Sequence, residues 1–168
     1  SIHGIGGWTD GEIYYFLRTG IRKDGSWSPP LMPKYMHLAD RDVQSIIAWL
    51  RSGDPSLIAD PRTYLPNKWN FTVKALTNTL FTAPPMPELP IALPDTSDKV
   101  AWGKYLADDL FGCFACHSAD IVKIDMMNPS LSAGYYGGGQ ILKSAEGRPV
   151  LSANLTPHPE FGIGKLTT

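Results

Sequence analysis

The chain has 168 residues, of which 43% are hydrophobic and 18% are charged, and its formal net charge is -1 at pH 7. This composition is typical of a globular protein of one or two domains. A near-zero net charge argues against nucleic acid as a partner, because phosphate binding needs a basic surface. No apolar run reaches the roughly 18 residues of a transmembrane helix, and 15 prolines and 16 glycines predict short helices joined by long, ordered loops.

The first clear helix signal begins near residue 9. Thr9 and Glu12 have the spacing of a capping box, and Gly20 is a typical stop. The apolar face expected of this helix holds Ile13, Phe16 and Leu17. We expect this face to pack in the core rather than to take part in chemistry.

A second amphipathic helix is predicted over residues 41–52. Asp40 is placed to cap it, and Gly53 and Pro55 are placed to end it. Its apolar residues recur with helical spacing, at i, i+3, i+4 and i+7, and they are Val43, Ile46, Ile47 and Leu50.

A methionine lies just before this helix, in a loop stiffened by prolines. Met32 is followed by Pro33 and preceded by two further prolines, so its side chain is held at a reduced entropic cost. A soft thioether sulfur suits a transition-metal centre. Met32 is therefore a candidate metal ligand; Met36 and His37 are alternative ligands, and core packing is the other interpretation of Met32.

The segment between residues 53 and 97 is rich in proline. Eight prolines predict a stiff and extended connector, interrupted by a short helix near residues 68–80. The eight are Pro55, Pro61, Pro66, Pro84, Pro85, Pro87, Pro90 and Pro94.

The chain has only two cysteines, and they form the pattern C-x-x-C-H at Cys113, Cys116 and His117. Two thiols three residues apart at a helix start can add to the two vinyl groups of one porphyrin. The next residue then presents an imidazole to the iron. A thioredoxin-type dithiol would follow a strand, and a structural zinc site would need further ligands. The pattern therefore favours covalently attached haem c.

A helix is expected immediately ahead of this motif. Residues 95–98 supply capping side chains, and residues 100–106 form a helical run. Gly103, inside this run, lowers the stability of the helix by about 1 kcal/mol relative to alanine. Either a close contact with another helix or tolerance at an exposed position explains a glycine there.

These elements resemble the class I-like cytochrome c family. In that family a helix precedes C-x-x-C-H, a later loop supplies a methionine ligand, and a final helix follows that loop. The segment from Met32 to residue 52 resembles this methionine loop and final helix. Here the methionine loop comes before the attachment motif, which is the reverse of the order in a single domain.

A tandem repeat explains the reversed order, if this chain contains the end of one copy and the start of the next. Residues 4–10 read G-I-G-G-W-T-D, and residues 162–168 read G-I-G-K-L-T-T, 158 positions later. The whole chain resembles tandem, multi-haem c-type cytochromes of the bacterial periplasm. In that interpretation, Met32 and His117 bind different irons. The rival is a permuted single domain in which Met32 serves the haem held at Cys113 and Cys116.

The fold class expected from this resemblance is mainly α, with cytochrome c-like helices, long ordered loops and two partial tandem domains. Residues 1–53 are the C-terminal half of a first cytochrome c domain. Residues 54–94 are the proline-rich connector. Residues 95–168 are the N-terminal half of a second domain with the haem attachment motif.

Other residues are expected near a cofactor. The indole N–H of Trp8 is a candidate donor to a haem propionate, and Leu166 fills the matching position of the second repeat. Tyr135, in a Gly-Tyr loop over residues 132–139, is a candidate wall of the haem pocket or donor to a haem propionate, as is the adjacent Tyr136; a surface loop without such a role is the other interpretation. Asn154 belongs to a segment, residues 153–166, that resembles the family's A-N-I-T-P-D stretch.

The remaining methionines and histidines are weaker candidates. They are the pair Met126 and Met127, expected to pack near the haem edge, and the isolated His3, His37 and His158.

The resemblance implies an electron carrier in the periplasm or on the outer face of the cytoplasmic membrane, so the protein needs export. Its partners would be redox proteins, namely a dehydrogenase or respiratory complex and an oxidase, with membrane association only through an anchor or partner outside this segment. The alternatives are a haem enzyme or sensor with an open axial position, and a structural subunit.

Overall fold

The structure is a computed structural model that describes residues 4–28, 32–60, 62, 70–79 and 82–166. The chain divides into two compact units, Ser1–Leu93 and Pro94–Thr168, and each is considered by itself. The prolines that precede Met32 and the isolated His3 lie outside the described residues.

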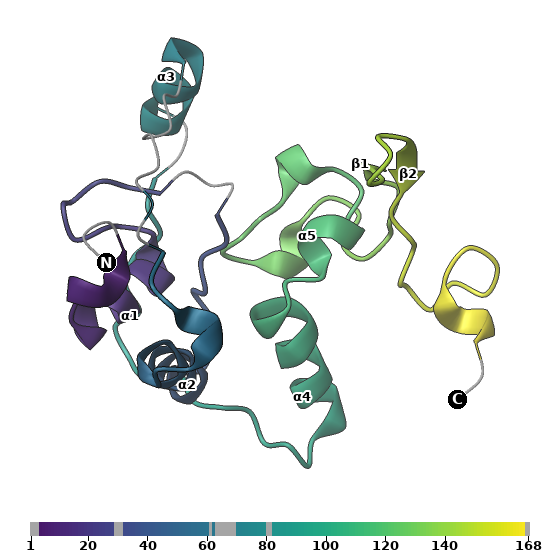
Figure 1. Ribbon diagram of the computed structural model, residues 1–168. Coiled ribbons are helices and arrows are strands. Elements are labelled where there is room, and N and C mark those ends of the chain that lie inside the picture. Colours follow the sequence, from purple (N-terminus) through teal and green to yellow (C-terminus); the bar gives the residue numbers. More distant parts are fainter. Residues whose placement is uncertain (1–3, 29–31, 61, 63–69, 80–81, 167–168) are drawn as a thin grey trace. The chain divides into compact units, whose positions relative to one another are not determined.

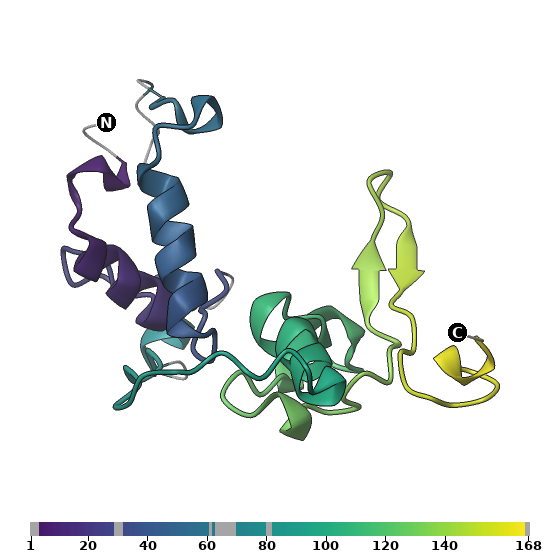
Figure 2. The ribbon, with the colours of Figure 1, turned by 90° about the horizontal axis from the view of Figure 1, so that it is seen from below.

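The first unit is built on two helices that pack against each other, α1 (Asp10–Thr19) and α2 (Asp40–Arg51) (Figures 1 and 2). The capping box predicted at the start of α1 is confirmed, and Gly20 ends the helix with a left-handed φ of 76°. Ile13 of α1 and Val43 and Ile47 of α2 are buried. The core of this unit therefore draws on the two predicted apolar faces.

The start of α2 differs from the prediction. Asp40 is the first residue of the helix, and the preceding Ala39 caps it without a side-chain hydrogen bond. The predicted cap is wrong because the Asp40 carboxylate instead accepts hydrogen bonds from Tyr14 and Arg18. A short helix in the proline-rich segment is confirmed as α3 (Phe71–Thr79).

The second unit begins with α4 (Lys99–Lys104), which Asp98 caps by accepting from two backbone N–H groups. The helix then widens into a π-helical segment, η3 (Tyr105–Leu110), that the sequence analysis does not predict. A one-turn helix follows, α5 (Phe114–His117) (Figure 1). The attachment motif thus lies where one helix ends and a short one begins.

A two-stranded antiparallel hairpin follows in the second unit (Figure 2). Strands β1 (Ile141–Lys143) and β2 (Pro149–Leu151) pair with Ile141 opposite Leu151. Gly147 adopts a φ of 78° in the turn between them. Each strand has only three residues, too few to show the alternation that identifies strands in a sequence.

Short 3-10 turns occur in both units, including at the two copies of the G-I-G motif. The turn at Ile5–Gly7 is flanked by an extended Gly4, and the turn at Ile163–Lys165 by an extended Gly162. In each, the residue after the turn donates its N–H to the first isoleucine carbonyl, at 3.0 and 2.9 Å. The two copies of the motif therefore share a local backbone structure. The other 3-10 turns are Pro55–Leu57, Ile121–Lys123 and Pro129–Leu131.

None of the helices in the described part of the chain is both long and apolar enough to cross a membrane.

Candidate functional site

The three residues of the C-x-x-C-H motif lie on a single turn. Cys113 is the N-cap of α5, and the N–H groups of Cys116 and His117 donate to its carbonyl at 3.2 and 3.0 Å. Both thiols are free; that of Cys113 is half-buried and that of Cys116 is exposed. The N–H of Cys113 donates to Ala107 at 2.8 Å, which fixes the motif to the π-helical segment. Residues at i, i+3 and i+4 share one helix face, so one flat ligand can meet all three side chains.

The ring of His117 is oriented by a backbone carbonyl 36 residues away. Its Nδ1 lies 2.9 Å from the carbonyl oxygen of Ala153. A carbonyl only accepts, so Nδ1 is the donor in this bond, and Nε2 is the ring nitrogen left to bind a metal. A hydrogen bond of this kind to the far ring nitrogen is the usual device that orients a histidine metal ligand and raises its basicity.

A glycine-rich loop holds the two partners of this bond together. The N–H of Gly138 donates to the carbonyl of His117 at 2.7 Å, and that of Gly139 donates to Ser152 at 3.0 Å. Gly138 has a φ of +68°, and a Cβ built on it would lie 2.6 Å from the backbone of Ala153. The loop and the acceptor segment therefore meet backbone to backbone, which only glycine allows.

Gly138→Ala tests this close approach. We expect it to destabilise the second unit by about 1–3 kcal/mol more than Gly139→Ala, because overpacking adds to the backbone strain. Gly139 is a matched control: its φ is +90°, but a Cβ there would meet nothing within 4 Å. Thermal unfolding of the two variants of the full protein measures the difference, and equal losses would contradict the close contact.

Tyr135 and Tyr136 do not present free hydroxyl groups. Both donate to the buried carboxylate of Asp108, Tyr135 at 2.7 Å and Tyr136 at 2.8 Å, and Lys104 forms an ion pair with the same carboxylate. Burial opposes ionisation of Asp108, but the hydrogen bonds from Lys104 and the tyrosines outweigh it and lower its pKa. Burial and the bond to Asp108 raise the pKa of both tyrosines. Sequence reasoning missed Asp108, which resembles a surface residue of a helix.

Two other predicted haem-pocket residues have local roles. The side chain of Asn154 accepts from the N–H and hydroxyl of Thr156, at 2.8 and 2.6 Å, and so fixes a turn directly after Ala153. Trp8 is half-exposed, and its ring packs edge-on against Phe16 with centroids 5.6 Å apart. Contacts of Asn154 and Trp8 with a cofactor stay predictions.

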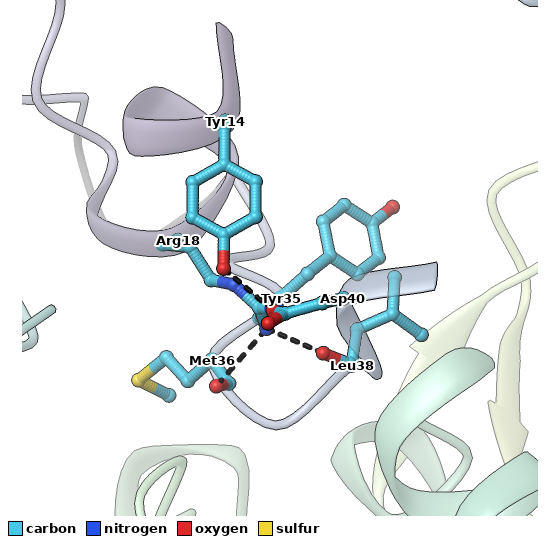
Figure 3. Close-up of polar contacts among 6 residues, drawn as sticks. All are labelled: Tyr14, Arg18, Tyr35, Met36, Leu38 and Asp40. Carbon is cyan, nitrogen blue, oxygen red and sulfur yellow. Dashed lines mark hydrogen bonds and ion pairs between the residues drawn. The ribbon is translucent and has the colours of Figure 1, made fainter. Parts of the chain in front are cut away.

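In the first unit, a fully buried arginine holds the loop that carries the methionines. Arg18 of α1 donates to the carbonyls of Tyr35 and Leu38 at 2.7 and 2.5 Å, and more weakly to that of Met36 at 3.3 Å (Figure 3). Its second nitrogen pairs with Asp40 at 2.5 Å. One guanidinium thus connects α1, the loop and the start of α2.

The charge of Arg18 is balanced within this network. The hydrogen bond from Tyr14 and the pairing with Arg18 lower the pKa of Asp40 against the effect of burial. Burial and the bond to Asp40 raise the pKa of Tyr14. The sequence offers little sign of this role, because an arginine in the last turn of a helix is also typical of an exposed position.

The two methionines of this loop differ in exposure. Met36 is buried at 7% exposure, whereas Met32 is 44% exposed, and its sulfur lies 3.5 Å from the hydroxyl of Ser28. Met32 is therefore the more accessible of the two thioethers. The neighbouring His37 is half-buried.

The donor set fits a porphyrin. Within the described ranges, no group of three or more His, Cys, Asp or Glu side chains is arranged to hold a metal ion. Two thiols and one imidazole nitrogen on a single turn suit a cofactor that brings four nitrogen ligands of its own and needs only attachment points and an axial ligand.

The chain is similar to cytochrome c subunits of dehydrogenases, which supports a c-type cytochrome. It is 32% identical to the fructose dehydrogenase cytochrome subunit of Gluconobacter japonicus over 166 residues, which cover 96% of this chain and 32% of that protein. It is 28% identical to the cytochrome c subunit of an alcohol dehydrogenase (quinone) of Gluconacetobacter polyoxogenes over 171 residues, which cover 97% of this chain and 35% of that protein.

The chain spans about a third of the length of these two cytochrome subunits. No protein-family model matches it.

Proposed function

We propose that the chain is part of an electron-transfer subunit, a c-type cytochrome that relays electrons from a dehydrogenase or quinol-oxidising complex to an acceptor. Haem c would be attached through Cys113 and Cys116, with His117 as an axial ligand. The haem would supply a reversible one-electron couple, and the protein would set its potential through ligands, hydrogen bonds and burial.

The observation that carries this proposal is the hydrogen bond between His117 Nδ1 and the Ala153 carbonyl. It commits one ring nitrogen to the protein and leaves the other for a metal, directly beside two free thiols. The role of the related cytochrome subunits in dehydrogenases agrees with an electron-transfer function.

We further propose that the chain contains parts of two tandem cytochrome domains. Two features support this arrangement: the G-I-G motif recurs 158 positions along the chain, and both copies form the same 3-10 turn after an extended glycine. In this arrangement Met32 ligates the haem of the first domain, and His117 ligates that of the second. Such a protein would work in the periplasm or on the outer face of the cytoplasmic membrane.

The absorption spectrum of the full-length protein, matured with its haem, tests the proposal. We expect low-spin haem that is reduced and reoxidised reversibly and does not bind carbon monoxide. Met32→Ala should weaken the far-red charge-transfer band of methionine-ligated ferric haem by the share of one haem and lower the potential of that haem, because His/Met ligation raises it. Met86→Ala, which alters an exposed methionine of the proline-rich connector, is the control.

The contrary result is a high-spin ferric haem in the unaltered protein that binds carbon monoxide rapidly on reduction. That outcome would identify an open axial position and favour a haem enzyme or sensor over an electron carrier.

A further inference from the structure

Asp108 is a buried carboxylate that the proposed electron transfer does not use. Its side chain is 1% exposed, whereas that of its ion-pair partner Lys104 is 61% exposed. Removing a carboxylate from water costs several kcal/mol unless hydrogen bonds compensate. Here the compensation comes from the hydroxyls of Tyr135 and Tyr136, which are packed edge to face with ring centroids 4.5 Å apart.

The backbone of Tyr136 is in an unfavourable conformation. Its φ is +57°, and it is the only described residue other than glycine with a positive φ. A bulky residue in the left-handed region is strained and persists only where its surroundings hold it. Two hydrogen bonds hold Tyr136: its hydroxyl donates to Asp108, and its carbonyl accepts from the N–H of Leu155 at 2.9 Å.

The bond from Leu155 connects Tyr136 to the segment that orients His117. Leu155 lies two residues after Ala153, whose carbonyl accepts the hydrogen bond from His117 Nδ1. Gly138, two residues after Tyr136, donates to the carbonyl of His117 and touches the backbone of Ala153. The loop held at Tyr136 therefore fixes both ends of the hydrogen bond that orients the imidazole.

We propose that Asp108 is a positioning residue for His117: through Tyr136 it fixes the loop that places the Ala153 carbonyl against the imidazole, and so it tunes the haem attached at Cys113 and Cys116. This inference rests on the proposed function. It assigns to Asp108 and Tyr136 an effect on the reduction potential that passes through the protein and involves no contact with the haem.

Tyr135 provides a matched comparison. It donates to the same carboxylate as Tyr136, and its own N–H binds the carbonyl of Ser132 at 3.1 Å. The backbone bond to Leu155 comes from Tyr136 and not from Tyr135. Tyr135→Phe and Tyr136→Phe each delete one hydroxyl from the same cluster, but only the second acts on the residue that is linked to the segment of Ala153.

The test compares these two variants in the haem-loaded, full-length protein by redox titration. In Tyr136→Phe we expect a weaker Nδ1–H bond, a less basic imidazole and a higher potential of this haem, because a less basic ligand stabilises ferric iron less. The one-electron equilibrium constant should shift several-fold, where a tenfold shift corresponds to about 59 mV. Tyr135→Phe should shift it less, and the Nδ1–H proton of His117 should exchange with deuterium faster only in Tyr136→Phe.

Three outcomes are informative. A larger shift in Tyr136→Phe than in Tyr135→Phe, with Asp108→Asn shifting the same haem, supports the inference. Equal shifts in the two tyrosine variants, or no shift with the haem still attached, overturn it and reduce Asp108 to a structural role. If the unaltered protein carries no haem at Cys113 and Cys116, the proposed function itself fails, and the haem content distinguishes that failure from the previous one.

Discussion

If haem is attached as proposed, we expect replacement of Cys113 and Cys116 together by alanine to remove one covalently attached haem from each polypeptide of the full-length protein. The two thiols are the only ones in this segment, so no neighbouring cysteine can replace them. Both are free and lie on one turn with His117, where a thioether bond from each would fix the porphyrin. Pyridine haemochrome analysis after acid extraction, expressed per polypeptide, should fall by one haem.

His117→Ala is the companion variant to the cysteine pair. It keeps both thiols but removes the proposed axial nitrogen. We therefore expect the protein that matures to retain its covalent haem, with a change from low spin to high spin. Loss of one haem in the cysteine variant with a spin change in the histidine variant separates attachment from ligation. An unchanged haem content in the double-cysteine variant, or two thiols of the native protein that react freely with an alkylating reagent, contradicts the attachment.

The features predicted correctly from the sequence are those set by neighbours in the chain. The capping box of Thr9 and Glu12, the stop at Gly20 and the apolar face of α2 each depend on residues within a few positions of one another. The attachment motif is equally local, and its role in binding haem stays a prediction. Its recognition needs five consecutive residues and no knowledge of the rest of the fold.

The features that were missed depend on contacts between distant residues. The acceptor for His117 is a backbone carbonyl at Ala153, and every residue has such a carbonyl, so no side chain marks it. Asp108 and Arg18 lie on helices where a charged residue is ordinary, and only the fold buries them. The assignment of the two units to halves of tandem cytochrome domains stays a prediction.

Both units are stabilised by the same kind of interaction. In each, one buried charged side chain binds a loop that carries residues of the candidate site: Arg18 binds the methionine loop, and Asp108 binds the Gly-Tyr loop. Long loops cost conformational entropy to order. A buried charge with several hydrogen bonds orders such a loop firmly, because leaving any of its partners unpaired is costly.

The second large effect, a loss of local stability, is expected on removing the buried arginine of the first unit. Arg18→Ala should destabilise the methionine loop and the start of α2 by about 3 kcal/mol or more, since it leaves three loop carbonyls and a carboxylate without their shared donor. Hydrogen exchange of residues 35–43 measures this locally. At 1.36 kcal/mol per tenfold change, 3 kcal/mol corresponds to exchange roughly a hundredfold faster.

The control for Arg18 is an exposed arginine of α2. Arg41→Ala removes a side chain of the same type one residue after Asp40, at an exposed position, and should change the free energy of local opening by less than about 0.5 kcal/mol. Tyr14→Phe deletes only one hydrogen bond to Asp40 and should give an intermediate loss of about 1–2 kcal/mol. If Arg18→Ala and Arg41→Ala give the same exchange, the guanidinium does not hold the loop, and the position of Met32 must depend on other contacts.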